Sequence, residues 1–180
     1  MTIAIKPTAS GSTIEQDGST ILTVDGSGNI TPSNNLYPKG PTFAAYLAGG
    51  DQSISTVTYT KIEMNTIEWD TNSCYDNTSG AFRFTPNVAG YYQINLTVRF
   101  KGTSTQGYIS AIFKNGAETY RIEHDQNTTV GPLRGAAGSA LVYLNGTTDY
   151  VEAYGWIQAT SPLIAQGQGL TRFTGHLVSV

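Results

Sequence analysis

Ten consecutive residues, YYQINLTVRF (residues 91–100), alternate between apolar and polar side chains. Successive side chains of a β-strand point to opposite faces of the sheet, so the two sets separate onto two faces. The apolar set is Tyr92, Ile94, Leu96, Val98 and Phe100, and the polar set is Gln93, Asn95, Thr97 and Arg99. The segment therefore predicts a strand with one buried face.

Similar runs of β-branched and aromatic residues recur along the chain, separated by Gly, Pro, Asn and Asp. No segment of about a dozen residues carries the apolar spacing of an amphipathic helix. This combination is typical of an all-β sandwich or barrel. The predicted strands span residues 42–47, 55–62, 66–69, 81–85, 90–100, 108–114, 118–123, 138–144, 150–158 and 172–180.

Residues 1–40 differ from the rest, and Pro38 and Pro41 mark the boundary because proline interrupts strand pairing. The pairs Asp17-Gly18 and Asp25-Gly26 predict hairpin turns. The apolar residues around these turns are Ile3, Ile5, Ile14, Ile21, Leu22, Val24 and Ile30. They are too few to close a core, so this N-terminal arm should lie against its own domain, a sister chain or a partner. The expected organisation is an arm over residues 1–40 and a globular domain over residues 41–180.

Charged residues make up only 13% of the chain and the net charge is −3, which leaves no basic stripe for nucleic acid. No run of about 18 apolar residues is present, so no membrane span is expected. The N-terminus also lacks the apolar segment of a signal peptide. These features disfavour nucleic-acid and membrane partners.

The residues that could carry chemistry are sparse. Cys74 is the only cysteine, which excludes an intrachain disulfide and a cysteine-rich zinc site. His124 and His176 are too few and too far apart to indicate a catalytic centre, and no G-x-S-x-G elbow occurs. No enzymatic activity and no cofactor are expected. A calcium site remains an alternative because oxygen ligands on loops suit that ion, with candidates at Asp51, Asp70, Asp76, Asp125 and Asp149.

A family resemblance rests on a series of motifs: FAAYL, YTKIE, YD…SGAFRFTPNVAGYY, IFKNG, GSALVYLNGTTDYVEAYG and FTGHLVSV. Residues 42–180 carry them in an order that resembles the globular-head domain of complement first component q, within the tumour-necrosis-factor-like superfamily. The most specific positions are Tyr75, Asp76, Gly80, Phe82, Phe84, Pro86, Gly90, Tyr91, Tyr92, Phe173 and Gly175. The resemblance implies a jelly-roll sandwich of about ten strands that forms a tight homotrimer. It also implies calcium as an alternative, since some relatives bind that ion near the trimer apex.

The chain departs from many relatives in having no collagen-like stalk, and its segment DGSTILTVDGSGNITPSN is similar in style to β-rich segments of phage fibres and decoration proteins. The expected function is a non-enzymatic trimeric virion protein, made in the host cytoplasm, that decorates or cements a phage capsid. Its arm would bind the major capsid protein or another virion protein by strand addition or apolar packing. One alternative is a fibre tip that binds a host glycan or surface protein, with Tyr108, Tyr120 and Trp156 as aromatic contacts. A more distant alternative is a secreted adhesin or spore-coat module.

Overall fold

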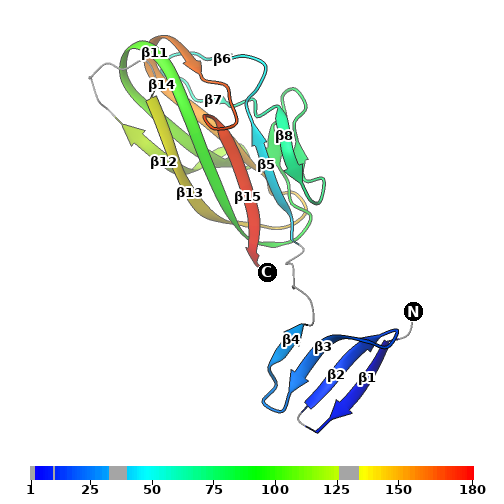
Figure 1. Cartoon of the computed structure of the whole chain (residues 1–180). Coiled ribbons are helices and arrows are strands. Elements are labelled where there is room, and N and C mark those ends of the chain that lie inside the picture. The colour runs from blue at the N-terminus through cyan, green and yellow to red at the C-terminus, as the bar shows by residue number, and fades with distance from the viewer. Residues whose placement is uncertain (1–2, 10, 33–39, 126–133) are drawn as a thin grey trace. The chain divides into compact units, whose positions relative to one another are not determined.

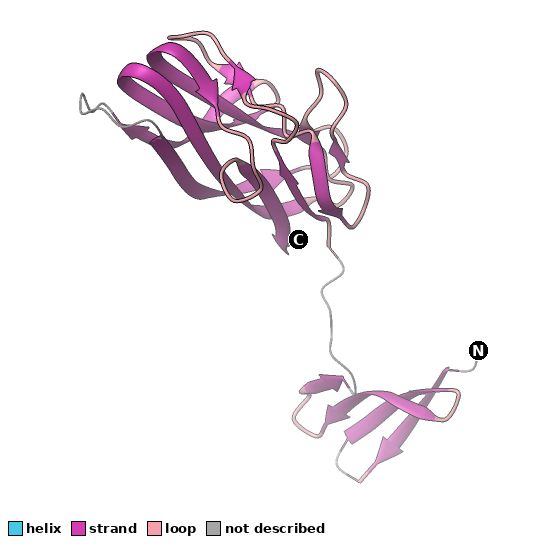
Figure 2. Ribbon diagram, turned by 45° about the horizontal axis from the view of Figure 1, so that its top comes forward, coloured by secondary structure: helices cyan, strands magenta, loops and turns pink. Residues whose placement is uncertain are grey.

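The computed structural model describes residues 3–9, 11–32, 40–125 and 134–180, and every regular element in these ranges is a β-strand (Figures 1 and 2). The chain divides into two compact units, residues 1–39 and residues 40–180. We call them the arm and the head. The all-β fold class predicted from the sequence is confirmed, and no helix able to cross a membrane occurs within the described ranges.

The arm is a four-stranded antiparallel sheet in which each strand pairs with the next: β1 (Ile3–Thr8), β2 (Gly11–Gln16), β3 (Ser19–Asp25) and β4 (Ile30–Pro32). The predicted turn at Asp17-Gly18 joins β2 to β3, and both residues have positive φ values, 48° and 85°. Two positive values in succession are the geometry that Asp-Gly favours in a tight hairpin. Asp25 instead opens a longer turn, where its carboxylate accepts the backbone N–H groups of Ser27 and Asn29 at 2.9 Å each.

The described residues of the head form eleven strands. They are β5 (Thr42–Tyr46), β6 (Gln52–Ser53), β7 (Thr60–Lys61), β8 (Thr66–Asp70), β9 (Tyr75–Asp76), β10 (Arg83–Phe84), β11 (Gly90–Lys114), β12 (Ala117–Asp125), β13 (Arg134–Leu144), β14 (Val151–Ile164) and β15 (Arg172–Ser179). The turn between β11 and β12 is the predicted Asn115-Gly116 pair, with φ values of 53° and 80°.

The long strand β11 belongs to both layers of the head. Its residues 90–100 lie between β13 and β15, whereas from Phe100 onward it lies between β12 and β14. The register shifts between Lys101 and Gly107, and such irregularities let a strand bend. The strands predicted separately at residues 90–100 and 108–114 are therefore one strand. It joins a first sheet, β8–β5–β15–β11–β13, to a second sheet, β12–β11–β14 with the short strands β6, β7, β9 and β10.

The core lies between these two sheets. The predicted buried face of β11 is confirmed, since its five apolar residues from Tyr92 to Phe100 are at most 1% exposed. Phe43 is the centre of an aromatic cluster: its ring centroid lies 4.4 Å from that of Phe84 and 5.1 Å from those of Tyr75 and Phe173. Interlocking aromatic rings contribute both buried area and favourable ring geometry. The result is the jelly-roll sandwich that the family motifs predicted.

Two strand predictions were wrong in extent. Of residues 55–62 only Thr60 and Lys61 form a strand, β7, and residues 54–59 form a loop between β6 and β7. In this loop Val57 has a φ of 57° and donates its N–H to the carbonyl of Ile157. The backbone of this loop therefore hydrogen-bonds to β14 where the loop crosses that strand, and these loop residues do not pair with β14 as a continuous strand. Residues 81–85 contain only β10, because Phe82 has a φ of 43° and breaks the extended chain before Arg83.

Candidate functional site

The outer face of the second sheet is closed. Ile109, Ala111 and Phe113 of β11 point away from the main core and form a second buried cluster beneath Tyr59, Tyr154 and Trp156. The Phe113 ring stacks on that of Tyr154 with centroids 3.9 Å apart, and Tyr59 meets its edge at 5.3 Å. The loop between β6 and β7 therefore covers the apolar residues of this face within the chain itself.

The outer face of the first sheet lacks such a cover. Outward-pointing residues of β11 pair with those of β13, so that Tyr91 lies opposite Tyr143 and Gln93 opposite Leu141. Tyr91, Leu141 and Tyr143 are 49%, 50% and 48% exposed. We call the outward face of β8, β5, β15, residues 90–100 of β11, and β13 the open face. Large apolar side chains that gather on an uncovered sheet are typical of an interaction surface.

One end of the open face is aromatic. The Tyr91 and Tyr143 rings meet edge to face at 5.4 Å. Lys114 donates from Nζ to the Tyr143 carbonyl at 2.9 Å and pairs with Asp149 at 3.0 Å. These bonds hold the strand that carries Tyr143 while its ring stays half exposed, so the aromatic end is fixed before any partner arrives.

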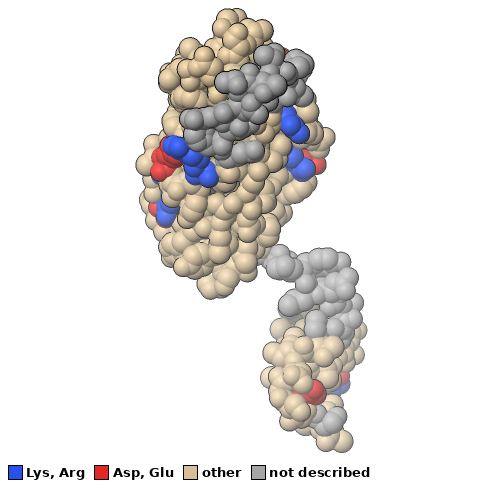
Figure 3. All heavy atoms as spheres, turned by 90° about the vertical axis from the view of Figure 1, so that its left-hand side faces the viewer, with Lys and Arg blue, Asp and Glu red and all other residues tan. Residues whose placement is uncertain are grey.

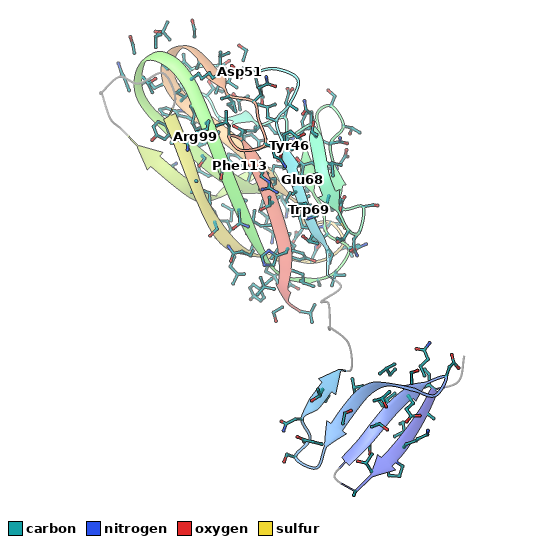
Figure 4. The ribbon with its side chains drawn as sticks, in the orientation of Figure 1. Tyr46, Asp51, Glu68, Trp69, Arg99 and Phe113 are labelled. Carbon is teal, nitrogen blue, oxygen red and sulfur yellow. The ribbon has the colours of Figure 1, made fainter. Side chains whose placement is uncertain are left out.

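The other end combines an aromatic ring with an ion pair. The Arg172 guanidinium pairs with the Glu68 carboxylate at 2.5 Å and lies over the Trp69 ring, 5.4 Å from its centroid. Trp69 donates from Nε1 to the Thr42 hydroxyl at 3.2 Å. Figure 4 shows Glu68 and Trp69 near Tyr46, which is paired with Arg172 in the ladder of β5 and β15. The centre of the face between the two ends is polar, with Asn95 donating to the Thr174 hydroxyl at 3.2 Å.

Arg99 lies on the same face, close to β13. A Cβ atom at Gly135 would stand 2.0 Å from its Nη1 atom, so the guanidinium lies directly over the backbone of Gly135. Its Nε atom is buried without an acceptor among the described residues. On the side of the head drawn in Figure 3, lysine, arginine and acidic residues form only a few small patches. Apart from Arg99 and the Arg172–Glu68 ion pair, the side chains of the open face described above are aromatic, aliphatic or uncharged polar groups, which suit contact with another apolar surface.

The arm offers a second candidate surface. The register places Ile3, Ile5 and Ile14 on one face together with Leu22, Val24 and Ile30, as Ile5 is paired with Ile14, Ile14 with Leu22, and Val24 with Ile30. Ile21 is the additional residue at the register shift between β2 and β3. Six of the seven apolar arm residues predicted for attachment therefore share one face.

The residues of the family motif have structural positions. Gly80 has a φ of 87°, and a Cβ atom at Gly90 would stand 2.4 Å from the Ser179 carbonyl oxygen. Pro86 is buried two residues after β10, and Gly175 lies against Phe43. Phe84, Tyr92 and Phe173 belong to the main core together with Tyr75, while Asp76 accepts the Thr78 N–H at 2.9 Å. Phe82 is buried but lies outside the core cluster because of its positive φ.

The three proposed aromatic contacts are not on one surface. Tyr108 is only 7% exposed and packs against Phe100 in the core, so its assignment as a surface contact was wrong. Tyr120 is half-buried against the main core, and Trp156 is half-buried against the second cluster. The alternating pattern that signals a strand does not reveal that both faces of the second sheet are covered.

The candidate calcium ligands have partners in their own loops. The Lys101 ammonium donates to Asp51 at 2.6 Å and lowers the pKa of that carboxyl, while Asp70 accepts the N–H groups of Cys74 and Tyr75. Asp149 accepts from Asn115, Lys114 and Asn145, and the side chain of Asp125 is outside the described set. Among the residues that the structure describes, no three His, Cys, Asp or Glu side chains cluster to hold a metal.

Cys74 lies in the core and is only 7% exposed. Burial raises the pKa of its thiol, and the nearby Asp70 carboxylate acts in the same direction. A raised pKa leaves less thiolate at neutral pH, which weakens the group as a nucleophile. His176 is exposed on β15, where it is paired with Gln93 of β11 and Thr42 of β5.

Comparison with known proteins is consistent with this geometry. A search of curated proteins found no match. Among solved structures, murine APRIL at pH 8.5 is similar with a TM-score of 0.55 and 10% identity, covering 78% of this chain and all of that one. The Eiger TNF of S. frugiperda is similar with a TM-score of 0.56 and 10% identity, covering 78% of this chain and 94% of that one. At these identities the likeness shows a shared TNF-like jelly-roll fold.

The family model for the C1q domain matches residues 45–178, which include both sheets of the head and most of the open face. The match covers well over half of the chain. The chain belongs to the C1q domain family.

Proposed function

We propose that this chain is a non-enzymatic structural protein whose heads form a homotrimer through the open face. C1q and TNF-like domains are typically trimeric and non-enzymatic. The observation that carries the proposal is the contrast between the two sheets: one outer face is covered by Tyr59, whereas the other leaves Tyr91, Leu141 and Tyr143 about half exposed. A closed threefold arrangement would bury these side chains once in each copy.

A single charge placed on the open face tests this part of the proposal. Leu141→Glu should give a monomer at micromolar concentration in sedimentation velocity, where the unchanged chain sediments as a trimer, because the carboxylate would be desolvated in the contact. Ser55→Glu is the control, since Ser55 is exposed on the loop that crosses the other sheet. A monomeric unchanged chain, or a Leu141→Glu variant that remains trimeric, would contradict the assignment.

The arm bears on where the trimer acts. We infer that this chain is a bacteriophage virion protein that decorates or cements the capsid, with the arm as the point of attachment to the major capsid protein or another virion protein. Three arms on one trimer would act multivalently, so modest individual contacts give firm attachment. The separate arm unit and the similarity in style of its segment to phage decoration proteins support this inference.

Fractionated particles test the virion assignment. Phage particles made by a host that carries the gene should contain the protein in the head fraction by quantitative mass spectrometry, and a gene lacking residues 1–39 should leave particles without it. Enrichment in tail fractions, with saturable binding of the purified trimer to host cells, would favour the fibre-tip alternative. Tyr108 is buried and is therefore not available as a contact residue of such a fibre tip. Absence from all particle fractions would overturn both.

A further inference from the structure

The arm is a single sheet layer with one uncovered apolar face. On that face Ile3, Ile5 and Ile30 are 60%, 72% and 64% exposed, although all three belong to strands that are paired in the sheet. The reverse face carries the charged residues, with Lys6 paired to Glu15. A sheet with an apolar face is stable in water only when a second layer covers that face. The arm therefore needs an occupant for its apolar side.

The chemistry of the face fits an identical copy. The register places Ser12 and Gln16 beside the six aliphatic residues, and no Asp, Glu, Lys or Arg of the described strands shares this side. Two or three such faces can meet without placing like charges together, and few polar groups would be buried without partners. A charged or strongly polar partner surface would gain nothing from this face.

We propose that the three arms of one trimer pack their apolar faces together around a common threefold axis, so that each arm is covered by the other two. The proposal rests on the homotrimer of heads proposed above and adds a second, separate contact to it. The polar faces of the arms, with Lys6 and Glu15, would then point outward and be the surface offered to the virion.

The width of the sheet fits this arrangement. Four strands spaced about 4.8 Å apart make a sheet about 19 Å wide, and a regular triangle with sides of that length has its sides about 5.5 Å from its centre. Face-to-face sheets pack about 10 Å apart, so each sheet normally stands about 5 Å from the middle of the side-chain layer. Three four-stranded sheets with strands along the axis therefore enclose about the space that one layer of inward side chains fills.

The number of strands also suits closure. Strands alternate in direction across the arm, so with four strands β1 and β4 run in opposite directions. Around a threefold axis, β4 of one copy would therefore lie antiparallel to β1 of the next. Antiparallel edges can pair, and a closed ring leaves no free strand edge. A sheet of three or five strands would bring parallel edges together instead.

The covalent connection favours this contact over others. Residues 33–39 join the arm to the head, and a stretch of seven residues spans at most about 25 Å. In a trimer of heads each arm is thus confined near its two sisters, at an effective concentration on the order of millimolar. A weak contact between arms is sufficient at that concentration.

Cysteine cross-linking in the full-length chain tests the arrangement. Ile14 and Thr13 are adjacent on the inner strand β2 and point to opposite faces. Sheets about 5.5 Å from the axis place the Ile14 Cα atoms of two copies about 10 Å apart, beyond the reach of a disulfide, so the probe is a short bismaleimide. With this reagent Ile14→Cys should give covalent dimers on a denaturing gel, whereas Thr13→Cys, on the outer face, should give none. The natural Cys74 is buried and should leave the unchanged chain unlinked. In hydrogen exchange, Ile14→Glu should remove the protection of the arm amides that Thr13→Glu retains.

The outcomes separate this inference from the function on which it rests. A full-length trimer in which Ile14→Cys does not cross-link, or in which both cysteine variants cross-link equally, overturns the packed arms and leaves the head trimer intact. Arms that lie on a capsid protein instead would give that first result, with amide protection appearing only on the particle. A monomeric full-length chain overturns the head trimer and the packed arms together.

Discussion

The head and the arm both contain strands with one apolar face, but only the head covers that face with a second sheet. In the head, the apolar residues of β11 face a second sheet, and Phe43, Tyr92 and Phe173 are completely buried. In the arm, the shorter strand β1 leaves Ile5 72% exposed. The difference is one of layers, because a strand pattern supplies an apolar face and only a second sheet covers it. We therefore expect the head to fold without help and the arm to depend on what it touches.

The sharpest test of this contrast removes one large apolar side chain from each unit. Phe43→Ala should destabilise the head by about 3–5 kcal/mol, because it removes the ring that contacts Tyr75, Phe84 and Phe173 and leaves a cavity. Ile5→Ala should leave the unfolding of the head unchanged. Urea unfolding followed by tryptophan fluorescence, at a fixed protein concentration, measures both. Equal losses in the two variants would mean that the units are not independent.

The head and the arm each contain a lysine–glutamate ion pair, and the two pairs differ in how far they are exposed. Lys61 of the head pairs with Glu152 at 2.6 Å, and Glu152 is only 3% exposed, whereas in the arm Lys6 is 60% exposed and its partner Glu15 is 14% exposed. Lys61→Met would leave the Glu152 carboxylate buried without its partner, which should cost about 3 kcal/mol of head stability. Lys61 also donates to the carbonyls of Gly80 and Ala81, so the variant releases that loop as well.

Lys6→Met is the matched control for this pair. Exposed ion pairs contribute about 0–1 kcal/mol, so the substitution should leave the urea midpoint of the head within error of the unchanged chain. A large loss for Lys6→Met would show that the arm supports the head. No loss for Lys61→Met would show that the Glu152 carboxylate does not depend on this partner.

Much of both units was predictable from local pattern. The alternation of residues 92–100 fixes which face of β11 is buried, and Asp17-Gly18 and Asn115-Gly116 specify turns through their tolerance of positive φ. Val57 and Phe82 gave no such signal: both have positive φ values although their side chains disfavour them. The positive φ values come from packing with residues that are far away in the sequence. The strands predicted at these two positions were too long for that reason.

The candidate surfaces were harder to predict. Strand alternation places Tyr92 in the core and its neighbour Tyr91 on the opposite face, but it does not show that this opposite face is uncovered. Tyr108 looked like a surface aromatic but lies where residues on both faces of β11 are buried. The cover provided by Tyr59 comes from a loop about fifty residues earlier in the chain, and such distant packing leaves no periodic trace in the sequence.

The smallest expected effect is on the stability of the head at acidic pH. The side chains of Asn115 and Lys114 and the backbone N–H of Asn145 hydrogen-bond to Asp149 and lower the pKa of its carboxyl. A group with a lowered folded pKa contributes stability that is fully present above its unfolded pKa of about 4 and is lost as the pH falls through the folded value. Asp149→Asn should therefore flatten the loss of head stability below pH 4, by about 1 kcal/mol or less because the site is near the surface.

Urea midpoints at pH 7 and pH 3 give the measurement, with Asp25→Asn as the control. Asp25 of the arm also has a lowered pKa, through bonds from its own turn to Asn29 and Ser27, but it lies in the other unit. Its replacement should leave the acid response of the head as it is in the unchanged chain. A flatter response in Asp25→Asn would couple the two units, and the contrast between a self-sufficient head and a dependent arm would then fail.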